Sequence, residues 1–323
     1  MKGLPTDKVP NLNIVMGLAA REAGVTYGQY VLDYRLLVEG NLRCAEKYGI
    51  DCYCAISDPS REASAMGATI MDTMDGPPVV QYSPVYEGYD ISKMTFPDPA
   101  DSPRTLDRLR AVEELVKRSA GDYPVIGWVE GVLAETADMR GVNNVMMDLM
   151  DETDGMKETM DRIFEYQCLF AKRQIEAGAD MIGIGNAVAS LIGPSLYEQY
   201  ALDYDMRLVQ YIQQQDALVK LHICGNISSL LPLLTKVQPD ILDIDWMVDF
   251  GQAVETFRNT KTCVDGNVDP VTVLLQGTPE HVREMVGSCL AVADADTMMA
   301  AGCEVPAKTP AENLIAMNEM LWL

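Results

Sequence analysis

Short apolar segments alternate with amphipathic helical segments along this sequence, and this alternation limits the fold more than any other feature. The apolar segments, each short enough for one buried strand, are residues 50–57, 124–131, 180–187, 218–225, 240–247, 261–269 and 297–305. Strands that alternate with helices pair in parallel through right-handed crossovers. Seven such strands, with an eighth expected in the less regular N-terminal part, predict a (β/α)8 TIM barrel.

We expect the 323 residues to form one barrel domain, with helical or irregular additions over about residues 1–48. Residues 74–97 interrupt the alternation with prolines and tyrosines, which predicts a hairpin-like excursion near the barrel mouth. An open, doubly wound sheet is the alternative fold. Its phosphate-binding glycine loop is absent after the first strand, and "GIGNAVAS" at 183–190 is a poor substitute, so close packing explains those glycines better.

Charge and composition exclude several classes of partner. The net charge is −23, and no basic stripe interrupts the acidic background, so nucleic acid and anionic membrane surfaces are not expected partners. The sequence has neither the apolar core of a secretion signal nor a run of about 18 apolar residues. These features predict a cytoplasmic protein whose eight cysteines are reduced.

His222 and Cys224 lie two positions apart near the end of one predicted strand, so their side chains share a face at the barrel's functional, C-terminal mouth. Imidazole and thiolate both suit Zn²⁺, although an ordinary core could also hold this pair. A catalytic zinc needs a third ligand, and Cys303, at the end of the last apolar segment, is well placed to supply it. Cys52 and Cys54 form a rival pair with no nearby histidine.

Five segments of the chain resemble the uroporphyrinogen decarboxylase superfamily, and within it the zinc-dependent, corrinoid-linked methyltransferases. The segments are residues 129–141, 176–200, 220–226, 265–282 and 302–317. The resemblance implies a TIM barrel with zinc bound by His222, Cys224 and Cys303 inside the C-terminal mouth. It also implies a partner corrinoid protein that carries cobalamin.

In thiol-methylating members of this family a carboxylate can fill the fourth zinc position. Asp243 and Asp245 share a strand face, and the resemblance makes Asp245 the expected ligand, although either residue could instead only orient the other ligands.

Further candidates for contact with the substrate lie at strand ends and in the excursion. They are Trp128, Glu130, Asn186, Asn226, Asn267, Tyr82 and Tyr86. Capping, turn formation or loop packing would explain each of them equally well. Asn186 stands where the family often has an aspartate.

The resemblance implies methyl transfer between a small molecule and the cobalamin of the partner protein. The tyrosine-rich excursion and Trp128 favour demethylation of an aryl methyl ether. Methylation of a thiol such as coenzyme M is the alternative, for which only Lys308 and Arg140 offer a basic anchor near the mouth. A zinc- or corrinoid-binding protein without turnover is a further alternative. The resemblance also disfavours porphyrinogen decarboxylation. The family's decarboxylases have an N-terminal segment whose arginine binds the substrate's carboxylates, and this chain has Arg21 and Arg35 in that part but no such segment.

Overall fold

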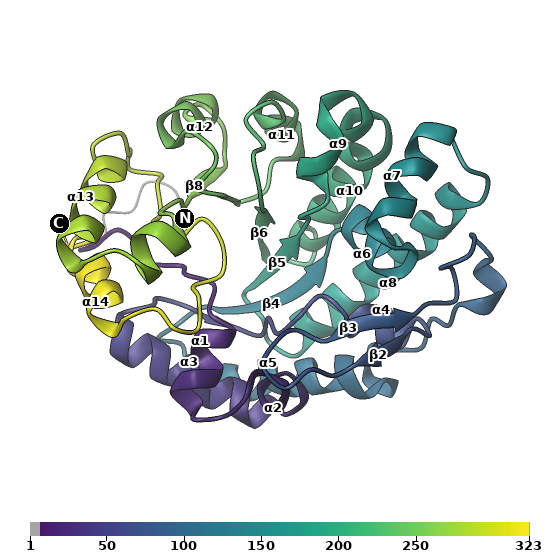
Figure 1. Cartoon of the computed structure of the whole chain (residues 1–323), viewed down its shortest axis with the longest axis horizontal. Helices are drawn as coiled ribbons and strands as arrows, with labels where there is room; N and C mark the ends of the chain where they lie inside the picture. The colour runs from purple at the N-terminus through teal and green to yellow at the C-terminus, as the bar shows by residue number, and fades with distance from the viewer. Residues whose placement is uncertain (1–6, 323) are drawn as a thin grey trace.

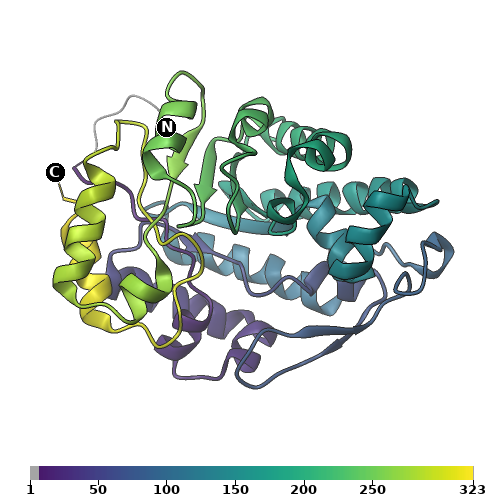
Figure 2. The same ribbon diagram turned by 45° about the horizontal axis from the view of Figure 1, so that its top comes forward.

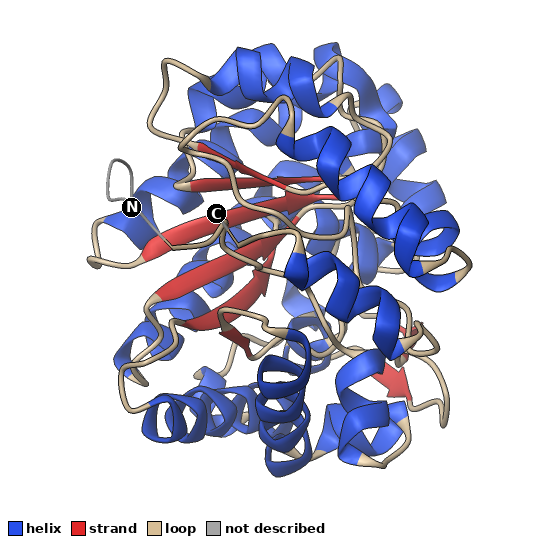
Figure 3. Cartoon of the chain, turned by 90° about the vertical axis from the view of Figure 1, so that its left-hand side faces the viewer, coloured by secondary structure: helices blue, strands red, loops and turns tan. Residues whose placement is uncertain are grey.

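A computed structural model describes residues 7–322 and contains one continuous sheet of six parallel strands in the order β1-β4-β5-β6-β7-β8. The strands are β1 (Tyr53–Cys54), β4 (Val125–Glu130), β5 (Met181–Gly185), β6 (Leu218–Ile223), β7 (Ile241–Ile244) and β8 (Cys263–Asp265). Figure 3 shows them side by side at the centre of the molecule, with the helices around them.

Two irregular segments, residues 9–14 and 297–305, close this sheet into a barrel. Val264 of β8 pairs in parallel with Thr297, and Met299 pairs in parallel with Asn11. The circle is completed by the backbone NH of Asp51, which donates to the carbonyl of Asn11 at 2.9 Å. The predicted TIM barrel is therefore confirmed. The predicted strand at 297–305 is present only as single bridge pairs. Residues 9–14 occupy the remaining strand position of the barrel, between this segment and β1.

Helices follow the strands along the chain and surround the sheet (Figure 1). They are α1 (Gly17–Ala23), α2 (Tyr27–Leu32), α3 (Tyr34–Tyr48), α4 (Arg61–Ala65), α5 (Pro103–Ser119), α6 (Val132–Arg140), α7 (Val142–Asp151), α8 (Met156–Glu176), α9 (Ala189–Leu196), α10 (Leu202–Gln213), α11 (Leu231–Val237), α12 (Phe250–Phe257), α13 (Pro279–Leu290) and α14 (Ala311–Glu319). Shorter helical turns lie at Ile91–Lys93, Pro99–Asp101, Tyr197–Ala201 and Pro270–Leu275. Among the described residues, no helix combines the length and apolar character that a membrane span requires.

Burial explains why the strands read as continuous apolar runs. All six residues of β4 are buried, because one face of the strand lines the barrel and the other is covered by α5 and α8. Helix α5 begins with Ser102 as its N-cap and Pro103 at its first position, where the missing backbone NH of proline costs no hydrogen bond. Its apolar face buries Leu109, Val112 and Leu115.

The interruption in the alternation is an antiparallel hairpin of β2 (Thr69–Met71) and β3 (Val79–Tyr82). It begins five residues before the predicted range of 74–97 and lies beside the parallel sheet, as Figures 1 and 2 both show. The turn of the hairpin reaches α2, where the NH of Gly28 donates to the carbonyl of Met74 at 3.0 Å.

Candidate metal centre and its pocket

The side chains of His222, Cys224 and Cys303 meet at the C-terminal mouth of the barrel. The Nε2 atom of His222 lies 3.0 Å from the Sγ atom of Cys224, which lies 3.4 Å from the Sγ atom of Cys303. All three potential ligand atoms are within 4.8 Å of one another. One nitrogen and two sulfur donors at this separation fit Zn²⁺, whose bonds to such atoms are about 2.0 to 2.3 Å long.

A buried carboxylate fixes the orientation of the imidazole. The Nδ1 atom of His222 lies 3.1 Å from the Oδ2 atom of Asp243, its register partner on β7, which leaves Nε2 toward the two sulfur atoms. Asp243 in turn contacts the Nζ atom of the buried Lys220 at 3.1 Å, and Lys220 reaches Asp265 at 2.6 Å. In metal sites, a histidine ligand commonly has a carboxylate at its other ring nitrogen, and this contact fixes the orientation of the ring.

The electrostatics of the group favour the thiolate form of Cys303 but not of Cys224, because the hydrogen bond with Cys303 and burial raise the pKa of the Cys224 thiol. A hydrogen bond from Cys224 and the nearby His222 lower the pKa of the Cys303 thiol below its ordinary value. Burial lowers the pKa of His222, but Asp243 and Cys224 outweigh burial and raise it. Because metals bind the deprotonated thiol, this bias toward thiolate suits a metal ligand.

The three ligands lie in a pocket of about 180 Å³. Its lining residues are Ile14, Met16, Ile56, Asp58, Pro59, Trp128, Glu130, Gly185, Asn186, Ala187, His222, Cys224, Cys303 and Glu304. Three of the predicted substrate-contacting residues, Trp128, Glu130 and Asn186, are therefore brought together with the three predicted ligands.

Two glycines of β5 make room for the pocket's aromatic and acidic walls. A Cβ atom at Gly183 would lie 2.0 Å from the Cε3 atom of Trp128, so the indole lies directly over this glycine. A Cβ atom at Gly185 would lie 2.6 Å from the Oε2 atom of Glu130. Since Gly185 pairs with Glu130 on one side and with His222 on the other, the carboxylate of Glu130 reaches across it toward the ligands.

Asn186 is held by a second buried acid. Its Nδ2 atom donates to both oxygens of Asp205, at 3.0 and 2.8 Å, and Asp205 also accepts from the hydroxyl of Tyr197 at 2.7 Å. Burial raises the pKa of Asp205 to about 7, against the opposing effect of these hydrogen bonds. The Oδ1 atom of Asn186 has no partner among the described residues.

Other predicted site residues lie outside the pocket. Asn226 is exposed and accepts from the NH of Ser228 in its own turn. Asn267 is buried, and its Nδ2 atom donates to backbone carbonyls in the turn after β7. Tyr82 and Tyr86 are 54% and 53% exposed on and after the hairpin.

Asp245, the expected fourth ligand, lies just beyond β7. Its Oδ2 atom accepts from the NH of Gly225 at 2.9 Å, and its Oδ1 atom accepts from the NH of Met247 at 3.1 Å. The cluster of three potential ligands does not include it. In this arrangement Asp245 fixes the turn that follows Cys224.

Sequence reasoning missed Glu304 and the acidic cluster behind β4. Glu304 follows Cys303 directly and accepts from the NH of Gly17 at 2.7 Å, so its position next to a predicted ligand was a usable signal. Arg61 contacts Glu62 at 3.1 Å and Glu130 at 3.2 Å, deep in the protein. No sequence spacing joins Arg61 and Glu62, which are neighbours on α4, to Glu130, which lies 69 positions after Arg61 at the end of β4.

The pocket adjoins a wider cleft of about 820 Å³, with which it shares Met16, Asp58, Pro59 and Glu304. The hairpin turn, Asp75 to Pro77, lines the outer side of this cleft. Of the two basic anchors considered from the sequence, Lys308 lies here, whereas Arg140 lies elsewhere, bound to Asp148 at 2.8 Å.

Comparisons with known proteins show the family and the fold of the chain. The uroporphyrinogen decarboxylase (URO-D) family profile matches residues 1–321 of the chain. The methylcobamide:CoM methyltransferase MtbA of Methanosarcina mazei is 31% identical over 267 residues, which are 81% of this chain and 76% of the relative. The uroporphyrinogen decarboxylase of Trichlorobacter lovleyi is 26% identical over 245 residues, or 74% of this chain and 70% of that enzyme. The solved structure of a methyltransferase from Methanosarcina mazei has the same fold, with a TM-score of 0.89 at 24% identity over 99% of this chain and 95% of that one.

Proposed function

The chain belongs to the uroporphyrinogen decarboxylase family, and we propose that it is a zinc-dependent methyltransferase that moves a methyl group between the cobalamin of a partner corrinoid protein and a small thiol. The observation that carries this proposal is the group of three metal-ligand side chains inside a pocket at the barrel mouth. Catalytic zinc sites use three protein ligands and keep a position for substrate, whereas structural sites use four. The ligand number therefore supports catalysis over a purely structural role.

Bound zinc would supply Lewis acidity that lowers the pKa of a coordinated thiol. The chain's own residues hold the site ready: Asp243 orients His222, and Asp245 fixes the turn that follows Cys224. In the reaction, the thiol sulfur forms a bond to the methyl carbon and the thiol proton is released. The cobalt–carbon bond breaks, its electron pair stays on cobalt, and Co(III) becomes Co(I).

Two observations support a thiol in preference to the aryl methyl ether that the sequence favoured. Relatives at 31% and 25% identity, from Methanosarcina mazei and Methanosarcina barkeri, are named methylcobamide:CoM methyltransferases. Tyr82 and Tyr86, on which the aromatic prediction partly depended, do not line the pocket. Trp128 does line it and keeps aryl ether demethylation as a second candidate.

The corrinoid partner would approach the barrel mouth. Exposed apolar side chains on the segments that follow β5, β7 and β8 support docking at this end; they are Leu191, Trp246, Met247 and Val271. Porphyrinogen decarboxylation has little support, because no lysine or arginine is among the described residues that line the pocket. Arg21 and Arg35 are paired with Glu22 and Asp33 respectively.

A direct test is to incubate the zinc-loaded protein with methylcobalamin and 2-mercaptoethanol. We expect loss of the methylcobalamin absorbance and formation of the S-methyl product. Cys303→Ala should lose bound zinc and this activity together, whereas Cys289→Ala, at a half-buried cysteine of α13, should retain both. Full zinc content and activity in Cys303→Ala would overturn the assignment. Transfer from guaiacol to cob(I)alamin, without thiol methylation, would favour the second candidate.

A further inference from the structure

The chemistry of the pocket wall bears on which thiol the site accepts. The acidic side chains that line it are Asp58, Glu130 and Glu304, and no lysine or arginine lines it among the residues described. Most of the remaining wall is apolar or aromatic, with Ile14, Met16, Ile56 and Trp128. A ligand group in this pocket therefore meets acids and an aromatic ring but no cation.

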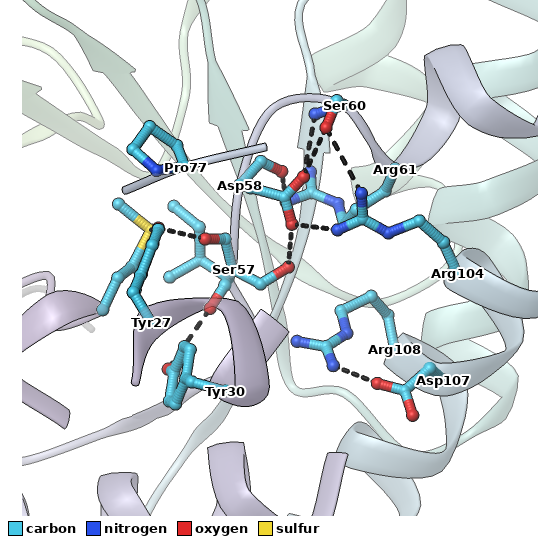
Figure 4. Close-up of polar contacts among 12 residues, drawn as sticks. Tyr27, Tyr30, Ser57, Asp58, Ser60, Arg61, Pro77, Arg104, Asp107 and Arg108 are labelled. Atoms are coloured by element: carbon cyan, nitrogen blue, oxygen red, sulfur yellow. Dashed lines mark hydrogen bonds and ion pairs between the residues drawn. The ribbon is translucent and has the colours of Figure 1, made fainter. Parts of the chain in front are cut away.

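The arginines around Asp58, which lines the pocket, are already bound to acids (Figure 4). Arg104 contacts Asp58 at 2.6 Å and Ser60 at 3.3 Å. Arg61 binds the carbonyl of Asp58 through Nη1, and it binds Glu62 and Glu130 through its other nitrogens. The charges of both arginines are therefore paired with acids, and the Nε atom of Arg104 is the one nitrogen of these two guanidinium groups that is buried without a hydrogen-bond partner among the described residues.

Arg108 lies below this network in Figure 4 and pairs with Asp107. It does not line the pocket. The buried region behind β4 holds further acids, since Glu135 and Asp138 lie beside Glu62 and Glu130, and burial raises the pKa of both well above the ordinary value. Each of the three arginines in this part of the protein is therefore paired with at least one acid.

Two acceptors remain open on the pocket side. The Oε1 atom of Glu130 is bound to Arg61, while its Oε2 atom extends across Gly185 toward His222. The Nδ2 atom of Asn186 donates to Asp205, which fixes the amide and leaves its Oδ1 atom as an unpartnered, buried acceptor. A ligand that donates hydrogen bonds would satisfy the Oδ1 atom of Asn186 and the ionised form of Glu130, whereas a sulfonate could accept only from the protonated form of Glu130.

We infer that the small molecule bound beside the metal ligands is a thiol whose other end carries an ammonium group, not a sulfonate. This inference rests on the proposed function and specifies its substrate class. The ammonium group lies against the carboxylate of Glu130, the amide oxygen of Asn186 and the indole of Trp128, and Trp is the ring that attracts cations most strongly. An anionic tail would instead lie next to carboxylates in a desolvated pocket, which is unfavourable.

The protonation of Glu130 is consistent with this assignment. Burial raises its pKa to about 8; Arg61 acts in the opposite direction, and Glu62 and Asp58 add to the increase. Without a cation the pocket remains near neutrality by keeping this proton. An ammonium group beside Glu130 takes the proton's place.

The test uses three thiols that differ only in the group at the end of a two-carbon chain: 2-aminoethanethiol, 2-mercaptoethanol and 2-mercaptoethanesulfonate. With zinc-loaded protein and methylcobalamin, we expect kcat/KM to fall in that order, with the amine at least about tenfold above the sulfonate. Calorimetric binding of the three S-methyl products should give the same order independently of turnover. A sulfonate that binds and reacts as well as the amine would overturn the inference and leave the proposed function intact.

Variants that remove one negative charge test which side chains of the pocket cause the preference for the thiol with an ammonium group. Glu130→Gln and Glu304→Gln keep the size of each side chain, and glutamine at 304 can still accept from Gly17. Each should lower the amine's advantage over the sulfonate by about threefold, whereas Asp75→Asn, which removes the same charge from the outer cleft, should not. An unchanged preference in both pocket variants would also overturn the inference. If no thiol is methylated, the proposed function fails, and binding of the S-methyl products still decides the charge preference.

Discussion

His222 and Asp243 face each other in register on β6 and β7, with the Nδ1 atom of the imidazole 3.1 Å from the Oδ2 atom of the carboxylate. This contact directs Nε2 to the metal position. We therefore expect Asp243→Asn to weaken zinc binding by about tenfold to hundredfold, measured by competition with a chelator. The control is Asp265→Asn, which removes the same charge from Lys220 without touching His222. Equal zinc affinities in the two variants would contradict the role given to Asp243.

Asp245 offers a contrasting case, because both of its oxygens already accept backbone NH groups, from Gly225 and Met247. Asn can accept only one of these bonds, so Asp245→Asn should lose about 1 to 3 kcal/mol of unfolding free energy. We expect its zinc content to remain that of the wild type. Metal analysis and denaturant unfolding of the same sample measure both quantities. Loss of zinc without loss of stability would instead make Asp245 the fourth ligand.

The sequence was sufficient to predict the barrel because β4 to β8 are buried on both faces and read as continuous apolar runs. The sequence was less informative about the two segments that close the barrel. Residues 9–14 and 297–305 pair only at single points. The regular strand predicted at 297–305 therefore does not form, and residues 9–14 were not singled out as part of the barrel. In the site, the i, i+2 spacing brought His222 and Cys224 together, and the family resemblance added Cys303.

The rest of the site depends on pairings between distant segments. The Oε2 atom of Glu130 reaches across Gly185 only because β4, β5 and β6 align in one register. Arg61 approaches Glu130 from α4, 69 positions earlier in the chain. Neither relation produces a local sequence pattern. The exposed positions of Tyr82 and Tyr86 likewise depend on how the hairpin packs, which composition does not determine.

Asp205 predicts a pH dependence of stability. Its pKa is about 7 in the folded protein, because burial raises it, compared with about 3.9 for an unperturbed aspartate. A folded state that holds the proton more tightly is favoured most below the unfolded pKa, and this contribution is lost as pH rises toward 7. Between pH 5 and 7, the wild type should therefore lose roughly 1 to 3 kcal/mol of unfolding free energy relative to Asp205→Asn. Denaturant unfolding at both pH values measures the difference.

The matched control for this prediction is Asp203→Asn, which removes a charge from an exposed position on the same helix, α10. Its stability should follow that of the wild type over this pH range. If the wild type and Asp205→Asn show parallel pH profiles, Asp205 is ionised throughout and does not act as a buried neutral acid.

The last prediction concerns barrel closure, because the ligands join a regular strand to an irregular one. His222 and Cys224 belong to β6 and its end, whereas Cys303 lies within the closing segment 297–305, which pairs with β8 and with Asn11. Metal bound by all three would therefore tie this segment to the sheet. Removing zinc with a chelator should speed amide hydrogen exchange at residues 297–305 more than in β4, whose pairing does not involve the ligands. The amides of Met299 and Gly302, which donate to the carbonyls of Pro10 and Val268, are the best reporters.

The same linkage should appear in global stability. Zinc at about a hundredfold excess over its dissociation constant stabilises a folded state by about 2.7 kcal/mol, provided that the unfolded chain does not bind it. The wild type and Cys289→Ala should both show an increase in Tm with zinc, and Cys303→Ala should show little or none. An equal increase in all three proteins would mean that zinc binds elsewhere. Exchange at 297–305 that does not respond to the chelator would mean that the closing segment is held by its backbone pairs alone.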